Sequence, residues 1–228
     1  MKGWEWDGDF SDEAWSGEIF ILCVPFSVDY SYFTLPGKCP ENVKLQDNFS
    51  LEEFDKTWYQ AYHYSSDGQL LSNCSTVELL YKPSGIYVNI SRVDRGLFHR
   101  QSIGQLKLVT PKNGASSDFE ITYTFENAPR SLKVRRYPFQ VLATNYKYYA
   151  TLYTCQYSPL INKHFIYVWI LSRNPTLNEV SKELAQKPLT QIGVNPNLLV
   201  KESWSKCSPK YYETQATEPR TFRFSVPI

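Results

Sequence analysis

The sequence lacks an excess of charge of either sign. Lysine and arginine total 24 against 23 aspartate and glutamate residues, which gives a formal net charge of +1. A protein that holds nucleic acid needs a strongly positive surface, because contacts to phosphate supply much of the affinity. We therefore expect no nucleic-acid partner.

Motifs of several enzyme and metal-protein classes are also missing. The chain has no glycine-rich phosphate loop, no block of like charges and no internal repeat. Its five cysteines form no C-x-x-C pair, and its histidines, His63, His99 and His164, show no metal-ligand spacing. We expect these histidines at a rim or on the surface. We also expect no metal site, no required cofactor and no catalytic residues.

Long apolar runs are scarce as well. The run from Ile19 to Phe26 is too short to span a bilayer, and acidic residues precede it where a signal peptide has a basic region. We therefore expect residues 1–38 to be an N-terminal extension with a degenerate signal-like segment, outside the folded domain. A folded N-terminal arm is the alternative. The polar, proline-containing segment 208–228 is expected to be a disordered tail.

Aromatic residues, in contrast, are abundant at 16% of the chain. Strand-length runs rich in tyrosine, phenylalanine, valine, isoleucine and threonine alternate with turn clusters, which is typical of an antiparallel barrel or sandwich. Eight strands closed into a barrel would leave room for one small ligand. The predicted strands are 57–64, 74–82, 86–94, 99–109, 118–126, 132–143, 148–156 and 164–172.

One amphipathic helix is predicted after the strands. Val180 and Leu184 have helical spacing within residues 178–187. Thr176 or Asn178 is the expected N-cap, and Pro188 is expected to end the helix.

The cysteines and three glycosylation sequons favour an oxidising compartment, and the weakest sequon is Asn73-Cys74-Ser75. The wide cysteine spacings suit long-range disulfides. Asn48 and Asn89 each begin an Asn-X-Ser triplet, and strand alternation places Asn89 on the outside of the sheet. We expect a secreted, extracellular protein with glycans at these two positions.

Three separated motifs resemble those of one family. They are FDKTWY at 54–59, LATNY at 142–146 and WILSRNP at 169–175. In this order they resemble the lipocalin family, closest to its branch of apolipoprotein D and the insect bilin-binding proteins. Lys56 stands where that family usually has glycine, and Asn145 stands where it has aspartate.

The resemblance implies a mainly β fold over residues 39–207. It is an eight-stranded antiparallel up-and-down β-barrel with one C-terminal α-helix packed outside. The resemblance also implies that Cys39 pairs with Cys155 and Cys74 with Cys207. By the same resemblance, Arg173 stacks on Trp58 at the barrel floor, a contact of roughly 0.5–2 kcal/mol.

Strand alternation from this floor gives the residues expected to line a ligand pocket. They are apolar or aromatic, with phenol hydroxyls among the rings, which suits a flat apolar ligand. The expected lining is Ile86, Val88, Ile90, Phe119, Ile121, Tyr123, Tyr137, Phe139, Val141, Leu152, Phe165, Tyr167, Trp169 and Leu171.

The expected function is that of an extracellular carrier that transports or sequesters a small hydrophobic ligand. By resemblance the candidate ligands are a bilin, a retinoid, a sterol or a fatty acid or related lipid. We expect a monomer or weak oligomer, with room for a peripheral lipid or receptor contact.

Three alternative functions are also compatible with the sequence. A haem- or salivary-type ligand-trapping lipocalin would need an inward histidine such as His99 or His164. A lipocalin-type isomerase would need a free cysteine inside the barrel. A solidly packed barrel acting as an interaction module is the remaining alternative.

Overall fold

The protein is described here from a computed structural model. The described residues are 35–65, 72–94, 98–109, 117–125, 129–130, 133–205 and 207. The expected signal-like segment and the expected disordered tail lie outside them.

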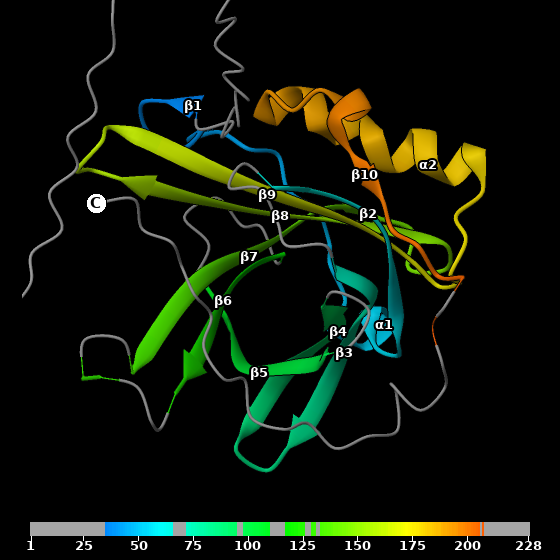
Figure 1. Ribbon diagram of the computed structural model, residues 1–228, viewed down its shortest axis with the longest axis horizontal. Coiled ribbons are helices and arrows are strands. Elements are labelled where there is room, and N and C mark those ends of the chain that lie inside the picture. The colour runs from blue at the N-terminus through cyan, green and yellow to red at the C-terminus, as the bar shows by residue number, and fades with distance from the viewer. Residues whose placement is uncertain are drawn as a thin grey trace, which may run out of the picture. The chain divides into compact units, whose positions relative to one another are not determined.

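Eight antiparallel strands form the body of the protein (Figure 1). From β2 to β9 each strand is hydrogen-bonded to the next, and β9 also pairs with β2, which closes the sheet into a barrel. This closure confirms the predicted barrel and excludes the sandwich. Every predicted strand is present within two residues of its expected ends. The strands are β2 (Trp58–Ser65), β3 (Ser72–Lys82), β4 (Gly85–Asp94), β5 (Phe98–Leu108), β6 (Asp118–Thr124), β7 (Val134–Thr144), β8 (Tyr149–Ser158) and β9 (Lys163–Ser172).

Two short strands extend this sheet. β10 (Val200–Lys201) pairs with β2 beyond the point where β2 leaves β3. β1 (Leu35–Pro36) pairs with β9. Residues 35 and 36 therefore lie in the sheet, ahead of the domain boundary expected at residue 39.

The predicted helix is α2 (Glu179–Gln186), and it packs on the outside of the barrel (Figure 1). The side chain of Asn178 accepts a hydrogen bond from the N–H of Ser181, so Asn178 is the N-cap. The α-helix ends at Gln186, just before Pro188, as predicted. The chain continues into the 3₁₀ helix η1 (Lys187–Ile192), and Pro188 lies in its first turn, where its missing N–H has no partner to lose. A second 3₁₀ turn, η2 (Pro196–Leu198), follows. Among the described residues, no helix has the length and apolarity needed to cross a membrane.

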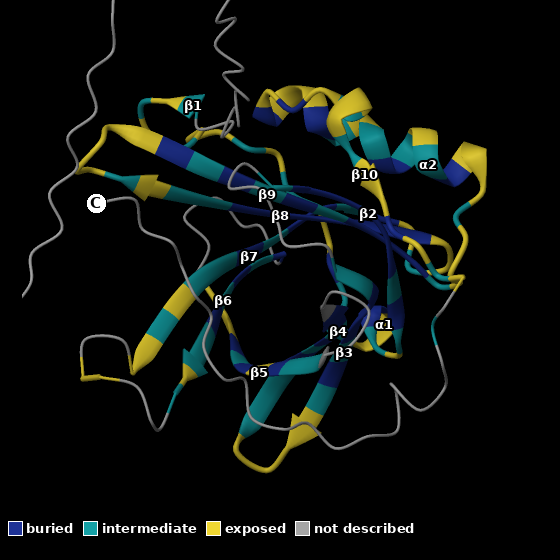
Figure 2. Cartoon of the chain, in the orientation of Figure 1, coloured by how far each residue is buried: buried dark blue, intermediate teal, exposed yellow. Residues whose placement is uncertain are grey.

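The helical segments cover the outer face of β8 and β9. Ile166, Val168 and Ile170 point outward on β9 and have no exposed surface, because they pack beneath η1 and α2 (Figure 2). The outer face of the barrel is thus a second hydrophobic core, separate from the interior.

Both expected disulfides are present. Cys39 is bonded to Cys155 and Cys74 to Cys207, across sequence separations of 116 and 133 residues. In the chain-entropy model each closure of this length contributes on the order of 4–5 kcal/mol. The second disulfide attaches the C-terminal segment to β3.

Three surface expectations are wrong. His63 and His164 are buried, not at the rim: His63 faces the barrel interior, and Nδ1 of His164 lies 3.0 Å from the carbonyl oxygen of Gly37. Asn89 does face outward, yet only 7% of it is exposed, between the neighbouring strands β3 and β5. A glycan on so buried an amide would not fit between the strands of the folded barrel, whereas Asn48 is exposed.

Candidate ligand-binding site

The floor of the barrel is built around Trp58. This side chain is fully buried, and its indole N–H donates to the carbonyl oxygen of Phe54 at 2.8 Å. The guanidinium of Arg173 lies over the indole, with Cζ 3.6 Å from the ring centroid. This is the stacking contact that the sequence motifs implied.

Arg173 also fixes the chain segments around the floor by hydrogen bonds. Its Nε donates to the carbonyl oxygen of Tyr146 at 2.9 Å, and its Nη1 donates to that of Thr57 at 3.2 Å. Its Nη2 donates to the carbonyl oxygens of Glu53 and Phe54. Burial lowers the pKa of this guanidinium, but a group of such high basicity stays charged.

The turn before β8 is held by Asn145. Its Oδ1 accepts from the backbone N–H groups of Tyr148 and Tyr149, at 2.9 and 3.1 Å. The amide oxygen of Asn145 therefore accepts the hydrogen bonds that an aspartate, the usual residue of the motif at this position, would accept in the turn.

Lys56 keeps the turn that glycine would normally make. Its φ is +77°, in the left-handed region that a side chain disfavours by about 1–2 kcal/mol. The chain accepts this strain and still places Trp58 at the floor.

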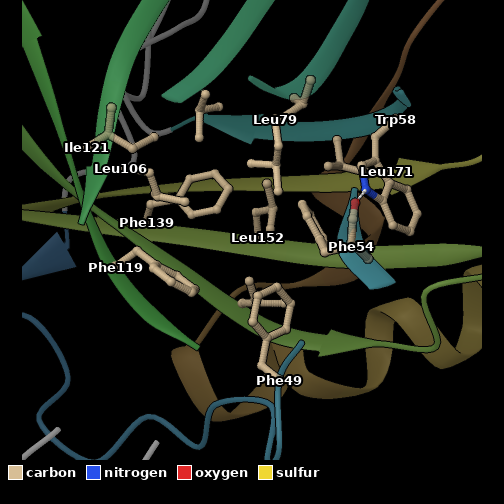
Figure 3. Close-up of a cluster of buried hydrophobic side chains, with 14 residues drawn as sticks. Phe49, Phe54, Trp58, Leu79, Leu106, Phe119, Ile121, Phe139, Leu152 and Leu171 are labelled. Carbon is tan, nitrogen blue, oxygen red and sulfur yellow. Dashed lines mark hydrogen bonds between the residues drawn. The ribbon is translucent and has the colours of Figure 1, made fainter. Parts of the chain in front are cut away.

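The lower half of the interior, next to Trp58, is closely packed (Figure 3). Most of the predicted lining residues meet there in one cluster. Buried in it are Val88, Phe119, Ile121, Phe139, Val141, Leu152 and Leu171, while Ile86, Ile90, Tyr123 and Trp169 pack against it.

Three predicted lining residues lie outside that cluster. Tyr137, Phe165 and Tyr167 are only half-buried. The ring of Tyr137 contacts that of Tyr123, and the ring of Tyr167 stacks on Trp169 with a centroid distance of 6.2 Å.

The upper half of the interior, away from Trp58, is more open. On β9 the inward rings of Phe165, Tyr167 and Trp169 keep exposed surface, whereas Ile166 and Val168 between them have none. The alternation of buried and intermediate residues is visible along β9 (Figure 2). Aromatic surface is therefore left uncovered on the inner face at the upper end of the barrel.

The sequence interpretation missed the short helix α1 (Leu51–Phe54), which covers the floor. Phe49 and Phe54 pack into the interior cluster from this segment (Figure 3). The signal was present, because Ser50 and Glu53 have the spacing of a helix N-cap, and the Ser50 side chain accepts from the Glu53 N–H.

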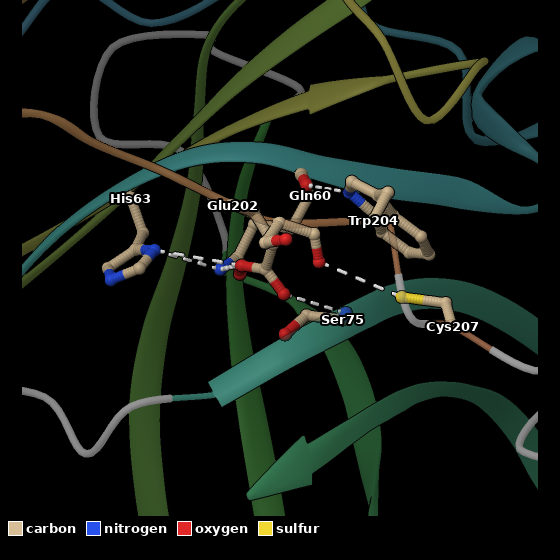
Figure 4. Close-up of polar contacts among 7 residues, drawn as sticks. Gln60, His63, Ser75, Glu202, Trp204 and Cys207 are labelled. Atoms are coloured by element: carbon tan, nitrogen blue, oxygen red, sulfur yellow. Dashed lines mark hydrogen bonds and ion pairs between the residues drawn. The ribbon is translucent and has the colours of Figure 1, made fainter. Parts of the chain in front are cut away.

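A buried polar cluster, missed from sequence, lies beside the upper part of β2 (Figure 4). The Glu202 carboxylate accepts from the side chain of Gln60 and, at 2.8 Å, from the N–H of Ser75. His63 Nδ1 lies 3.2 Å from the Gln60 amide nitrogen, from which it accepts, and 3.7 Å from the Glu202 carboxylate. His63 pairs with Trp169 in register, so it faces inward. Glu202 thus ties the C-terminal segment into the gap between β2 and β3.

The inward phenols are neutral hydrogen-bonding groups. Burial raises the pKa of Tyr123 well above its ordinary value, and the neighbouring Tyr137 adds to this effect. Burial also raises the pKa of Tyr137. Both hydroxyls therefore stay protonated at physiological pH and can orient a polar group of a ligand.

Neither histidine expected for the haem alternative faces the interior, and the inward histidine is His63, which contacts Gln60 and Glu202. His99 contacts the Ser91 hydroxyl at 2.7 Å and, like His164, lies on the outer face. All cysteines among the described residues are in disulfides, and Cys23 lies outside them. The described residues also contain no group of three or more potential metal ligands.

A separate hollow of about 500 Å³ lies outside the barrel, between α2 and the segment before α1. Lys44, Gln46, Leu184 and Gln191 are among its lining residues. It is distinct from the barrel interior and contains none of the predicted lining residues.

Comparisons with known proteins agree with this architecture. The model of the lipocalin / cytosolic fatty-acid binding protein family matches residues 98–206. Insecticyanin-B of Manduca sexta is 27% identical over 78% of this chain and 85% of its own length. The bilin-binding protein of Pieris brassicae is 26% identical over 67% and 76%, and apolipoprotein D of Mus musculus 24% over 75% and 85%. The solved structure of Manduca sexta insecticyanin superposes with a TM-score of 0.64 at 26% identity, covering 75% of this chain and 89% of that one.

Proposed function

We propose that the chain is a member of the lipocalin family and that it carries a small apolar ligand inside its barrel. Enclosing such a molecule removes its surface from water, at roughly 25 cal/mol per Å² of apolar area. The role is transport or sequestration, without a chemical step. We assign it to residues 39–207, together with the short strand at residues 35 and 36.

The observation that carries this proposal is the aromatic surface left uncovered on the inner face of β9. The inward rings of Phe165, Tyr167 and Trp169 keep exposed surface, while their outward neighbours have none. Aromatic surface left open inside a barrel is available for a ligand to cover. The packed lower half sets the depth to which the ligand can enter.

A flat conjugated molecule suits the described walls best. Tyr167 and Trp169 stack with an interplanar angle of 10°, which leaves parallel ring surfaces on one wall. The bilin-binding protein among the relatives supports a bilin as one candidate. Retinoids, sterols and fatty acids share the apolar body that such walls accept.

We also propose an extracellular setting for the carrier. Two long-range disulfides are stable in an oxidising compartment and rare in the cytosol. The sequon at Asn48 is exposed and fits the same setting.

Binding of biliverdin, followed by visible absorption and calorimetry, tests the proposal. We expect saturable binding of one molecule per chain. Trp169→Ala and Tyr167→Ala should each weaken it by about tenfold or more, because each removes apolar contact worth over about 1.4 kcal/mol. Tyr148→Ala is the matched control, since Tyr148 is 44% exposed near the floor.

If biliverdin binds with the same affinity to both interior variants and to the control, the proposal is contradicted, because the bound molecule then lies outside the barrel. Melting curves of each variant separate loss of binding from loss of folding.

A further inference from the structure

The inner wall continues upward from the predicted lining into arginine side chains. On β4, Ile90 packs against the interior cluster, and the next inward residue is Arg92. Arg92 pairs in register with Arg100 of β5. Directly opposed residues of an antiparallel pair point to the same face, so both arginines project inward.

A third arginine reaches the same region from β7. Arg135 pairs in register with Tyr123, whose ring packs against the interior cluster. The next residue, Arg136, points outward. Its side chain is 67% exposed and lies 3.7 Å from Glu120. Arg135 and Arg136 are therefore adjacent in sequence but project from opposite faces of the barrel wall.

Tyr123 lies on β6, between the strands β5 and β7 that carry Arg100 and Arg135. It lies against Gly104, where an added Cβ would be 2.9 Å from the tyrosine Cε1. Arg92 lowers the pKa of Tyr123 and Arg135 lowers that of Tyr137, each opposing the larger effect of burial. The charges of Arg92 and Arg135 thus act on phenols inside the barrel. We call Arg92, Arg100, Tyr123, Arg135 and Tyr137 the arginine–tyrosine cluster.

Carboxylates near these strands are placed differently. Glu78 faces outward opposite Asn89 and accepts from the Thr57 hydroxyl, and Glu120 is the outward partner of Arg136. The inward carboxylate of Glu202 is already held by Gln60 and Ser75. Arg92, Arg100 and Arg135 are the charged side chains described on the inward rows of β4 to β7, and Asp94 follows Arg92 at the end of the β4 row.

Arg92 and Arg100 directly oppose each other on adjacent strands, and like charges in this arrangement repel, so an anion beside them is favoured. Both arginines also make other contacts within the chain. A guanidinium has five N–H donors, so one guanidinium can bind an anion in addition to contacts within the protein.

We propose that the arginine–tyrosine cluster binds a carboxylate of the ligand. The barrel then selects apolar molecules that carry an acid group over neutral ones of the same shape. The ligand's apolar body lies against Trp169 and the lower interior, and its acid group points to the open end. This inference rests on the proposed carrier function and narrows its ligand class.

Biliverdin and its dimethyl ester form the decisive probe pair, because the ester keeps the chromophore and removes both acid groups. We expect the acid to bind at least about tenfold more tightly than the ester to the full chain. Arg92→Gln and Arg135→Gln should each reduce acid binding by about five- to tenfold and leave ester binding within about twofold. Arg136→Gln is the matched control and should change neither. In the unmutated protein, added salt should weaken acid binding and not ester binding.

The three possible negative results lead to different conclusions. If acid and ester bind equally well, the selection for an acid group is overturned while the carrier function stands. If Arg136→Gln weakens acid binding as much as Arg135→Gln, the contact is a surface attraction and the inward site is overturned. If neither probe binds, the proposed carrier function fails, and the acid-binding cluster fails with it.

Discussion

The guanidinium of Arg173 lies 3.6 Å from the ring centroid of Trp58 and joins the end of the last barrel strand to the start of the first. The same side chain donates to the carbonyl oxygens of Glu53 and Phe54 within α1 and to that of Thr57 after it. One residue therefore fixes both the closure of the barrel and the helix that covers its floor.

Replacing this arginine by lysine tests the importance of its shape. Arg173→Lys keeps the charge but loses the planar fork that reaches several carbonyl oxygens at once. We expect the free energy of unfolding to fall by about 2–3 kcal/mol, measured by urea denaturation. Arg136→Lys, on the exposed outer face, is the control and should change it by less than about 0.5 kcal/mol. Equal effects would show that the fork has no special role.

The strained turn at Lys56 gives a stabilising prediction. Lys56→Gly relieves a φ of +77°, so the protein should gain about 0.5–1 kcal/mol after the greater freedom of glycine in the unfolded chain is counted. Lys56→Ala keeps the strain and should give no such gain. Thermal unfolding measures both, and a loss of stability in the glycine variant would contradict the assigned strain.

The buried carboxylate of Glu202 is predicted to hold the C-terminal segment in place. Glu202→Ala leaves the Ser75 N–H and the Gln60 amide without their acceptor, and should destabilise the protein by about 2–4 kcal/mol. Hydrogen exchange should speed up in residues 200–205 before the rest of the barrel. Glu120→Ala removes a partly exposed carboxylate and serves as the control. Unchanged exchange at 200–205 in Glu202→Ala would refute the attachment.

Tyr153 gives a prediction for alkaline pH. Its side chain is 1% exposed, its hydroxyl makes no hydrogen bond within the described residues, and burial raises its pKa to about 12. An unfolded tyrosine loses its proton near pH 10, so this contribution to stability is intact below pH 10 and is lost as pH rises through about 12.

Tyr153→Phe removes both the ionisable group and the unpaired hydroxyl. At neutral pH the variant should be as stable as the original protein or more stable by about 1 kcal/mol. Between pH 10 and 12 it should lose less stability than the original protein does. Tyr148→Phe, at an exposed position, should not share this alkaline effect. A strongly destabilised Tyr153→Phe at neutral pH would mean that the hydroxyl has a partner.

The sequence predicted the barrel well because its signals are local or repeated. Strand-length patterning located all eight strands, and two-residue alternation gave the inward faces of five of them, β4, β6, β7, β8 and β9. Trp58 and Arg173 lie in compact motifs at the two ends of the barrel. Asn178 was found as an N-cap because capping depends on neighbouring residues.

The remaining features depend on contacts that no local pattern specifies. The burial of Asn89 follows from the strands on either side of it. The inward orientation of both Gln60 and His63 follows from a register shift in β2 between Gln60 and Tyr62, which breaks simple alternation. Arg92 and Arg135, in contrast, continue rows that were correctly assigned from sequence. Their charged side chains break the apolar pattern from which an inward row is recognised in a sequence.

Native mass spectrometry of the chain purified from secreting cells, before and after organic extraction, tests the carrier function most directly. We predict one small molecule bound per chain, absent after extraction, and recovered in the extract as an apolar compound with an acid group. A chain that carries no added mass and that takes up no biliverdin after extraction would contradict the carrier function.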